Sequence, residues 1–152
     1  VCHGNICRSP MAEFLMKDLV KKAGLADRFY IESAATSSEE IWGGQGNPVY
    51  RPAAQKLREN GISCAGKRAQ QMSRSDYRKY DLLIGMDSAN IRNMHRICGG
   101  DPDGKIRKLL DYTERGGDVA DPWYTRDYET AWQDIREGCT ALLAALCAGE
   151  QV

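Results

Sequence analysis

A cysteine, five further residues, an arginine and a serine stand directly before a predicted helix, and this arrangement constrains the fold more than any other feature of the chain. Five residues between the cysteine and the arginine let the backbone wrap around one tetrahedral anion, with its N–H groups pointing inward. A helix that follows at once turns its positive N-terminal end toward the same anion. The stretch consists of Cys2, His3, Gly4, Asn5, Ile6, Cys7, Arg8 and Ser9.

The residue types in this stretch suit an anion-binding loop with a nucleophile. Gly4 permits a tight or left-handed turn that a side chain resists. Arg8 can hold two phosphate oxygens with its planar guanidinium group. Cys2 would lie at the bottom of a bowl of positive potential, which favours the thiolate that phosphoryl transfer needs. The simpler alternative is a buried cysteine near a helix start, but the Pro10 and amphipathic helix that follow disfavour it.

Apolar periodicity along the rest of the chain predicts strands that alternate with helices. Helices are expected over 10–23, 52–60 and 128–146, with a short one opened by Ser73 and Asp76. A further helix, which Asp87 can cap, is expected to follow that residue and to reach about residue 97. Extended or strand segments are expected at 29–31, 82–86 and 106–110. This alternation predicts an α/β fold with a parallel sheet and helices on both faces.

Length and charge limit the classes of protein to consider. The 152 residues fit one domain, which we expect to span residues 1–152. The 21 Lys and Arg residues balance the 21 Asp and Glu residues. Nucleic acids and anionic membranes bind clustered positive charge, so we expect neither as a partner. The sequence also has no apolar run of the roughly 18 residues that a membrane span needs.

Cysteine usage favours reduced thiols over a metal site. The six cysteines form no Cys-x-x-Cys pair, and only two histidines accompany them. Structural zinc sites usually show close ligand pairs, so no metal is expected. Scattered cysteines without a secretory signal predict a cytoplasmic protein.

Asp121, Pro122, Trp123 and Tyr124 form a second motif, in the segment before the last predicted helix. A phosphate monoester releases an alkoxide or phenolate, so a positioned carboxylic acid would help by protonating it. From the local sequence alone, Asp-Pro is more simply interpreted as a turn.

Taken together, these motifs resemble the low-molecular-weight protein tyrosine phosphatase family, in a bacterial-type form. The resemblance covers residues 2–13 and continues, in the family's order and spacing, through 32–37, 86–90 and 121–124. It implies a three-layer αβα fold with a four-stranded parallel sheet in the order 2-1-3-4. It also implies a monomer that dephosphorylates phosphotyrosine in proteins and peptides, and small aryl phosphates, through a cysteinyl-phosphate intermediate. Inorganic phosphate would be a product, and no cofactor would be needed.

The resemblance assigns roles to the catalytic residues and the cleft walls. Cys2 would be the nucleophile, Arg8 would hold the phosphate, and Asp121 would be the general acid. Trp123 and Tyr124 would line the cleft and stack on a phenyl ring.

The same resemblance assigns supporting roles around the loop. Asn5, Ser9 and Ser33 would hold the phosphate loop rigid, and Ser9 would also assist the thiolate. Cys7 would form a reversible disulfide with Cys2 under peroxide, which is the arrangement of a redox switch.

Two regions depart from the family pattern. Glu39 and Glu40 stand where an aromatic cleft residue is often found, and Trp42 follows as a candidate wall in a lengthened loop. The two carboxylates at the rim would disfavour acidic peptides. Lys67 or Arg68 stands where mammalian members place a histidine that braces the loop.

Three alternative functions stay open. A phosphoarginine phosphatase of the same family would carry Thr at the position of Ile6, and isoleucine favours tyrosine. A thiol-dependent arsenate reductase would need two more closely placed cysteines, and Cys64 and Cys98 are far apart in sequence. A catalytically dead phosphopeptide-binding module is disfavoured by the intact Cys2, Arg8 and Asp121.

The phosphate loop should spring from the carboxyl end of a strand. Val1 alone cannot supply that strand, so about five to eight further residues are expected upstream, a usual strand length.

Overall fold

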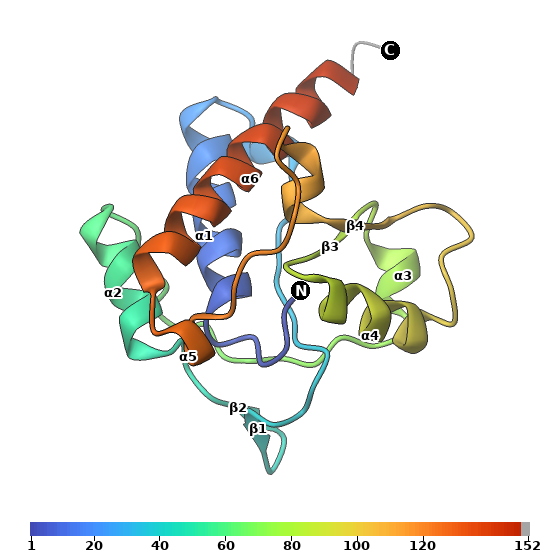
Figure 1. Cartoon of the computed structure of the whole chain (residues 1–152), viewed down its shortest axis with the longest axis horizontal. Helices are drawn as coiled ribbons and strands as arrows, with labels where there is room; N and C mark the ends of the chain where they lie inside the picture. Colours follow the sequence, from blue (N-terminus) through green and yellow to red (C-terminus); the bar gives the residue numbers. More distant parts are fainter. Residues whose placement is uncertain (150–152) are drawn as a thin grey trace.

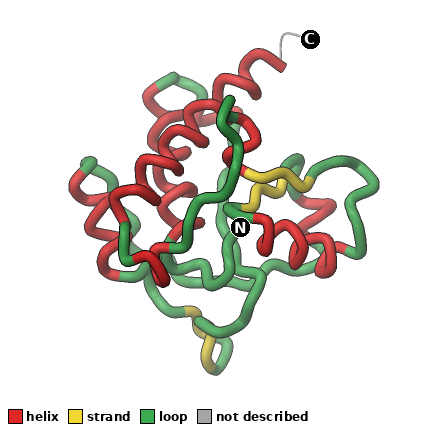
Figure 2. The backbone as a smooth tube through the Cα atoms, viewed as in Figure 1, coloured by secondary structure: helices red, strands yellow, loops and turns green. Residues whose placement is uncertain are grey.

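The computed structural model describes residues 1–149, which form helices, short strands and long connecting loops (Figures 1 and 2). The α-helices are α1 (Arg8–Lys22), α2 (Arg51–Glu59), α3 (Asp76–Lys79), α4 (Ser88–Cys98), α5 (Pro122–Thr125) and α6 (Tyr128–Gly149). The strands are β1 (Ile41–Trp42), β2 (Gln45–Gly46), β3 (Leu83–Gly85) and β4 (Ile106–Lys108). Two short 3-10 helices are η1 (Ala26–Arg28) and η2 (Leu109–Tyr112).

Helices cover both sides of the β3–β4 pair, as the sequence predicts. Helices α1, α2 and α6 lie together on one side, and α3 and α4 lie on the other (Figure 1). The larger apolar core joins Met11 of α1, Leu57 of α2 and Ile135 of α6. A smaller core joins Tyr77 of α3 and Met94 of α4 to the strands.

The contact between α6 and η2 depends on a glycine. A Cβ atom added to Gly138 would lie 2.5 Å from Cγ of Leu109, far closer than carbon atoms approach. Leu109 is fully buried, so it cannot move aside into solvent. The bare face of α6 at Gly138 therefore sets how closely this helix packs on the segment that follows β4.

The four-stranded sheet expected from the resemblance is not formed within residues 1–149. β3 pairs in parallel with β4, and β1 pairs with β2 in an antiparallel hairpin. Residues 29–31 take no strand conformation, and Ala35 makes only isolated parallel bridges, to Cys2 and Gln71. A cavity of about 450 Å³ lies among residues 29–34 and 82–84.

Sequence patterns located the remaining elements with small errors. Asp87 caps α4 as expected, and its carboxylate accepts the N–H of Asn90 at 2.7 Å. The strand expected over 106–110 ends at Lys108, because Leu109 and Leu110 turn into the core as η2. The sequence analysis did not foresee the β1–β2 hairpin or α5. None of the helices within residues 1–149 is long and apolar enough to cross a membrane.

Candidate active site

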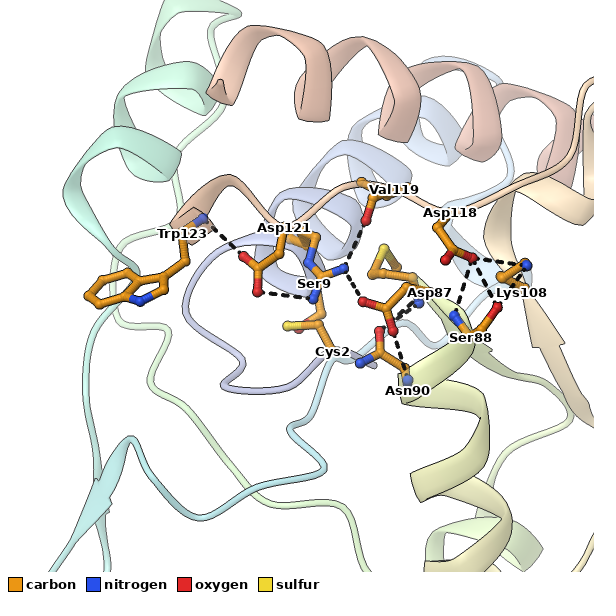
Figure 3. A network of polar contacts seen from close by, with 12 residues as sticks. Cys2, Ser9, Asp87, Ser88, Asn90, Lys108, Asp118, Val119, Asp121 and Trp123 are labelled. Atoms are coloured by element: carbon orange, nitrogen blue, oxygen red, sulfur yellow. Dashed lines mark hydrogen bonds and ion pairs between the residues drawn. The ribbon is translucent and has the colours of Figure 1, made fainter. Parts of the chain in front are cut away.

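The phosphate loop, residues 2–9, curls around the sulfur of Cys2 and runs directly into α1 (Figure 3 shows part of this site). Cys2 is 3% exposed. Its Sγ atom accepts a hydrogen bond from the backbone N–H of Asn5 at 3.3 Å and lies 3.0 Å from the hydroxyl of Ser9. Helix α1 begins at Arg8, so the positive end of the helix faces the loop. The loop thus gathers the donors that an anion would need around a buried thiol.

Asn5, rather than Gly4, takes the left-handed conformation in this loop. Asn5 has φ 58°, while the φ of Gly4 is not positive. Asparagine tolerates this conformation better than most residues. A Cβ atom added to Gly4 would lie 3.2 Å from the Cγ of Glu40, so a side chain here would be in tight contact with that residue. Of the two possibilities expected for Gly4, a tight turn or a left-handed one, the left-handed conformation is therefore found at Asn5 instead.

The side chain of Asn5 is at the centre of the hydrogen bonds that were predicted to hold the phosphate loop rigid. Asn5, Ser9 and Ser33 are together called the brace. Its amide nitrogen donates to the hydroxyl groups of Ser9 at 2.8 Å and Ser33 at 2.9 Å. Its amide oxygen accepts the backbone N–H of Gln70 at 3.0 Å. All three residues are at least 95% buried, namely Asn5, Ser9 and Ser33. Water therefore has little access to compete for these hydrogen bonds. The structure thus brings together the three residues to which the family resemblance assigns this role.

Arg8 is held in place from two sides, by Asp87 and by Asp121. One guanidinium nitrogen lies 2.6 Å from a carboxylate oxygen of Asp87 and donates to the carbonyl of Val119 at 2.8 Å. The other lies 3.4 Å from a carboxylate oxygen of Asp121. Burial by itself lowers the pKa of Arg8, but Cys2, Asp87 and Asp121 together raise it. The group therefore stays cationic although it is 3% exposed.

The sequence analysis did not predict that Asp87 would hold Arg8 in this site. Its sequence context, Met-Asp-Ser-Ala-Asn, indicates only a helix cap. In the structure the same carboxylate caps α4 with one oxygen and binds Arg8 with the other. Capping fixes the carboxylate, and the fixed carboxylate in turn orients the guanidinium group.

Asp121 lies at the N-terminus of α5, beside Arg8. Its Oδ1 atom accepts the backbone N–H of Trp123 at 3.0 Å, and its Oδ2 atom faces Arg8. The side chain is 26% exposed, so one edge stays open to the cleft. The Asp-Pro pair thus starts a short helix and also places a carboxyl group at the mouth of the loop.

The loop forms the floor of a cleft of about 200 Å³ with aromatic walls. Trp123 and Tyr124 line it, as predicted, and are 56% and 82% exposed. Tyr50 and Tyr128 also line it, and Tyr50 contacts the Trp123 ring edge-on at 5.7 Å. The sequence analysis missed both tyrosines. Tyr128 belongs to an apolar helix stripe that suggests packing alone.

The rim of the cleft differs from the expected one. Trp42 is 75% exposed on the β1–β2 hairpin and is not among the residues that line the cleft. Glu39 and Glu40 do line it. Glu39 lies 3.0 Å from the imidazole of His3, and Glu40 accepts a hydrogen bond from Asn47 at 2.8 Å.

Cys7 and Lys67 each have a defined place next to the loop. Burial, with a smaller contribution from Cys2 and Asp121, raises the pKa of Cys7, so its sulfur is a neutral thiol. Lys67, rather than Arg68, reaches the brace, because its ammonium group donates to the carbonyl of Ser33 at 2.9 Å. Arg68 instead donates to the carbonyl of Gly46 at 3.1 Å. Within residues 1–149, no three His, Cys, Asp or Glu side chains are placed to hold a metal ion.

The site combines a buried thiol that accepts the N–H of Asn5, a fixed guanidinium group and a nearby carboxyl group. This combination defines a class of site, one for thiol-dependent chemistry on a phosphate group. Comparison with known proteins gives the family. The family model described as "Low molecular weight phosphotyrosine protein phosphatase" matches residues 1–152. The chain belongs to this family, and is a low-molecular-weight protein-tyrosine phosphatase.

Individual relatives agree with this assignment. The low molecular weight protein-tyrosine-phosphatase YfkJ of Bacillus subtilis is 40% identical over 154 residues, covering 100% of this chain and 96% of the relative. The YfkJ crystal structure superposes with a TM-score of 0.92 and covers 97% of this chain and 92% of that one. The phosphatase SP-PTP of Streptococcus pyogenes has a TM-score of 0.82 at 40% identity, covering 95% and 89% of the two chains.

Proposed function

We propose that this chain hydrolyses phosphotyrosine in proteins and peptides, through a phosphate ester on Cys2. The observation that carries the proposal is the convergence of three groups on one small cleft. The Cys2 sulfur lies at its floor, Arg8 is locked beside it by Asp87, and the carboxyl group of Asp121 stands at its mouth. These groups match a nucleophile, a phosphate clamp and a general acid.

In the first step, the Cys2 thiolate attacks the phosphorus atom. An S–P bond forms with an electron pair from sulfur, and the bond from phosphorus to the tyrosine oxygen breaks. Asp121 gives its proton to the departing phenolate oxygen. Arg8 and the loop N–H groups balance the charge on the phosphoryl oxygens.

In the second step, water attacks the phosphorus atom and Asp121 takes a proton from it. The S–P bond breaks, inorganic phosphate leaves, and Cys2 returns as a thiolate. The hydroxyl of Ser9, 3.0 Å from the sulfur, is placed to donate to this thiolate as it leaves. Both steps are completed without a metal ion or cofactor.

Arg8 lies 3.4 Å from the carboxyl group of Asp121. A dianionic phosphate bound in the loop would compete with that carboxyl group for the same guanidinium group.

The walls and the rim support a preference among phosphate esters. Tyr50, Trp123 and Tyr124 offer aromatic surface to a phenyl ring. Glu39 and Glu40 add negative charge at the rim, which repels acidic residues beside the phosphotyrosine. The proposed substrates are therefore phosphotyrosine sites without acidic flanks.

Two other functions receive less support. An arsenate reductase would relay electrons through further thiolates, but burial raises the pKa of both Cys64 and Cys98. A phosphoarginine phosphatase is disfavoured by Ile6, as the family resemblance implies. The neutral thiol of Cys7 suits a resolving cysteine, and we propose that it forms a disulfide with Cys2 on oxidation of the latter.

The finer features of the fold and setting remain proposals as well. We propose one domain with a four-stranded parallel sheet in the order 2-1-3-4. The parallel bridge of Cys2 to Ala35 and the bond from the Val1 amino group to the carbonyl of Ile84 support that order of neighbours. We further propose a cytoplasmic monomer.

The direct test compares matched peptides that carry phosphotyrosine or phosphoarginine in the same flanking sequence. The proposal expects metal-independent release of phosphate, in buffer with chelator, with phosphotyrosine as the better substrate. Faster release of phosphate from the phosphoarginine peptide would favour a phosphoarginine phosphatase. Thioredoxin-coupled reduction of arsenate would favour an arsenate reductase. Failure to release phosphate from the phosphotyrosine peptides would reject the proposal.

A further inference from the structure

The general acid of the proposed reaction lies on a segment that has no regular structure of its own. Residues 113–121 connect η2 to α5 and take no helix or strand conformation. Gly116 and Gly117, in the middle of this segment, have φ angles of 60° and 94°, which glycine adopts far more readily than other residues. Contacts with other parts of the fold must therefore fix where Asp121 lies.

Asp118, the residue after the two glycines, is bound to two elements of the fold (Figure 3). Its Oδ1 atom accepts the backbone N–H and the hydroxyl of Ser88, each at 3.2 Å. The same atom lies 3.0 Å from the ammonium group of Lys108, which also donates to the hydroxyl of Ser88 at 3.3 Å. Ser88 is the first residue of α4, and Lys108 is the last residue of β4. Asp118, Ser88 and Lys108 are together called the Asp118 anchor.

Val119 continues this attachment on the inner side of the segment. It is the one buried residue among residues 113–121. Its N–H donates to the carbonyl of Met86 at 2.9 Å, and its carbonyl accepts from Arg8 at 2.8 Å. Asp118 thus holds the backbone directly before Val119, and Asp121 follows two residues later. A shift of Asp118 would be passed along this short stretch of backbone to Asp121.

The contacts of Asp121 itself are weaker. Its distance to Arg8 is long, at 3.4 Å, and its other bond is to the N–H of Trp123, two residues along the chain. A bond so local in sequence orients the carboxyl group but does not place the segment. Beyond Asp121, the Trp123 ring meets Tyr50 edge-on, a contact between exposed side chains. The position of the acid above the loop therefore depends on the backbone that leads to it.

Stability alone is a poor explanation for the Asp118 anchor. The side chains of Asp118 and Lys108 are 46% and 17% exposed, and ion pairs in contact with water add little to stability. Burial by itself raises the pKa of Asp118, but the contacts with Lys108 and Ser88 lower it overall. The group is therefore a carboxylate at neutral pH and can accept all three bonds.

We propose that the Asp118 anchor positions the general acid: Lys108 and Ser88 hold Asp118, and Asp118 holds the backbone that places Asp121 at the mouth of the phosphate loop. The three members of the anchor are positioning residues, since none of them lines the cleft. The inference rests on the proposed function, because it concerns the acid of that same reaction.

Arg115 provides a matched control for Asp118. It lies on the same segment, its side chain is also 46% exposed, and it forms ion pairs with two carboxylates of α6. The two glycines separate it from Asp118 and from the acid. If any charged contact on the segment were sufficient, Arg115→Met and Asp118→Ala would have similar effects.

The experiment measures kcat/KM for phenyl phosphate and for p-nitrophenyl phosphate, and the competitive inhibition constant of inorganic phosphate. Phenolate is the poorer leaving group, so its departure depends more on the acid. For Asp118→Ala we expect kcat/KM for phenyl phosphate to fall by roughly 5- to 50-fold, as for a small misplacement of a reacting group. The other two values should change by less than about threefold, because Cys2 and the phosphate loop stay in place. Lys108→Met should show the same pattern, Lys108→Arg should recover most of the loss, and Arg115→Met should resemble wild type.

A second comparison tests the route through Asp121. In the Asp121→Ala background, Asp118→Ala should cost little more, because the acid that the anchor positions is absent. If Asp118→Ala does not fold, as judged by circular dichroism, Asp118→Asn replaces it and should show the same pattern, since it removes the charge that Lys108 holds.

A wild-type ratio of the rates for the two esters in folded Asp118→Ala would overturn the inference. An equal loss in Arg115→Met would overturn it too, as would an undiminished loss in the Asp121→Ala background. Absence of Cys2-dependent turnover in the wild type would instead reject the proposed function.

Discussion

The phosphate loop and the rim of the cleft are neighbours, yet they are built in opposite ways. In the loop, Asn5, Arg8 and Ser9 are nearly fully buried, and hydrogen bonds fix each of them. At the rim, Trp123 and Tyr124 are largely exposed, and Glu39 makes a surface contact with His3. The groups that act on every phosphate ester thus lie in the buried, hydrogen-bonded loop. The groups that contact the rest of the substrate lie at the exposed rim.

This contrast predicts that substitutions in the loop will impair turnover of every substrate. Substitutions at the rim will change the relative rates of different substrates. The following variants test the contrast in order of decreasing effect.

The largest effect is expected for Cys2→Ser. Serine at the loop floor lacks a thiolate, so turnover of p-nitrophenyl phosphate and of phosphotyrosine peptides should be abolished. Cys147→Ser, near the C-terminal end of α6, serves as the control and should be fully active. Turnover that persists in Cys2→Ser would exclude this cysteine as the nucleophile.

Asp121→Ala should cost about 10²- to 10⁴-fold in kcat for esters with poor leaving groups, the usual range for general acid catalysis. The loss should shrink for p-nitrophenyl phosphate, whose leaving group needs little protonation. Measured rates against leaving-group pKa would show this as a steeper dependence than in wild type. A loss below about threefold for phosphotyrosine would place the general acid elsewhere.

Glu13→Gln tests the base of the loop through stability. Burial raises the pKa of Glu13, but Lys17, Ser33 and Lys67 outweigh it and lower the pKa overall. A carboxyl group with a lowered pKa stabilises the folded state above its unfolded pKa of about 4.3, and this stabilisation is lost as pH falls through the folded value.

Urea unfolding of Glu13→Gln at neutral pH should therefore show a loss of about 3 kcal/mol, the scale for removing one partner of a buried pair. The difference from wild type should shrink as the pH is lowered below about 4. A difference that stays constant over this range would show that Glu13 does not stabilise the fold through its charge.

Trp123→Ala tests the aromatic wall. Loss of one ring contact should lower kcat/KM for phosphotyrosine by about three- to tenfold. Hydrolysis of an alkyl phosphate of similar size, which has no ring to stack, should change little. Equal losses for both esters would mean that Trp123 supports the loop or Asp121 rather than the substrate ring.

The smallest effect is expected for Glu39→Gln. Removing this exposed charge should raise kcat/KM for a phosphotyrosine peptide with acidic flanks by about two- to fivefold, and added salt should reduce the gain. The rate with p-nitrophenyl phosphate should stay the same. Glu59→Gln, on α2, is the control, and a similar gain there would exclude a local effect of the rim.

The same contrast explains how much of the molecule could be predicted from sequence. The spacing of Cys2, Arg8 and Ser9 identifies the loop, because backbone geometry and the helix end determine what five intervening residues can do. The role of Asp87 in holding Arg8 was not predicted, because the two residues are 79 positions apart and their bond leaves no local pattern in the sequence. Trp42 was misjudged for a related reason, because the path of a loop, unlike a helix, does not follow from residue spacing.

The fold shows this limit as well. Long helices such as α6 can be predicted from the period of their apolar residues, and the apolar stripe of α6 faces the core as expected. Strands of two or three residues, such as β3 and β4, are too short for a period to show. Which segments pair in a sheet is decided by contacts distant in sequence, and one sequence alone does not report them.

The central claim is that phosphate passes through the sulfur of Cys2, and trapping this species tests it most directly. Asp121→Ala slows attack by water on the intermediate, so mixing this variant with p-nitrophenyl phosphate and quenching in acid should preserve it. Peptide mass spectrometry should then find one phosphoryl group on Cys2 and none after treatment that cleaves S–P bonds. A phosphoryl group on another residue, or p-nitrophenol release with no phosphorylated peptide, would contradict the account.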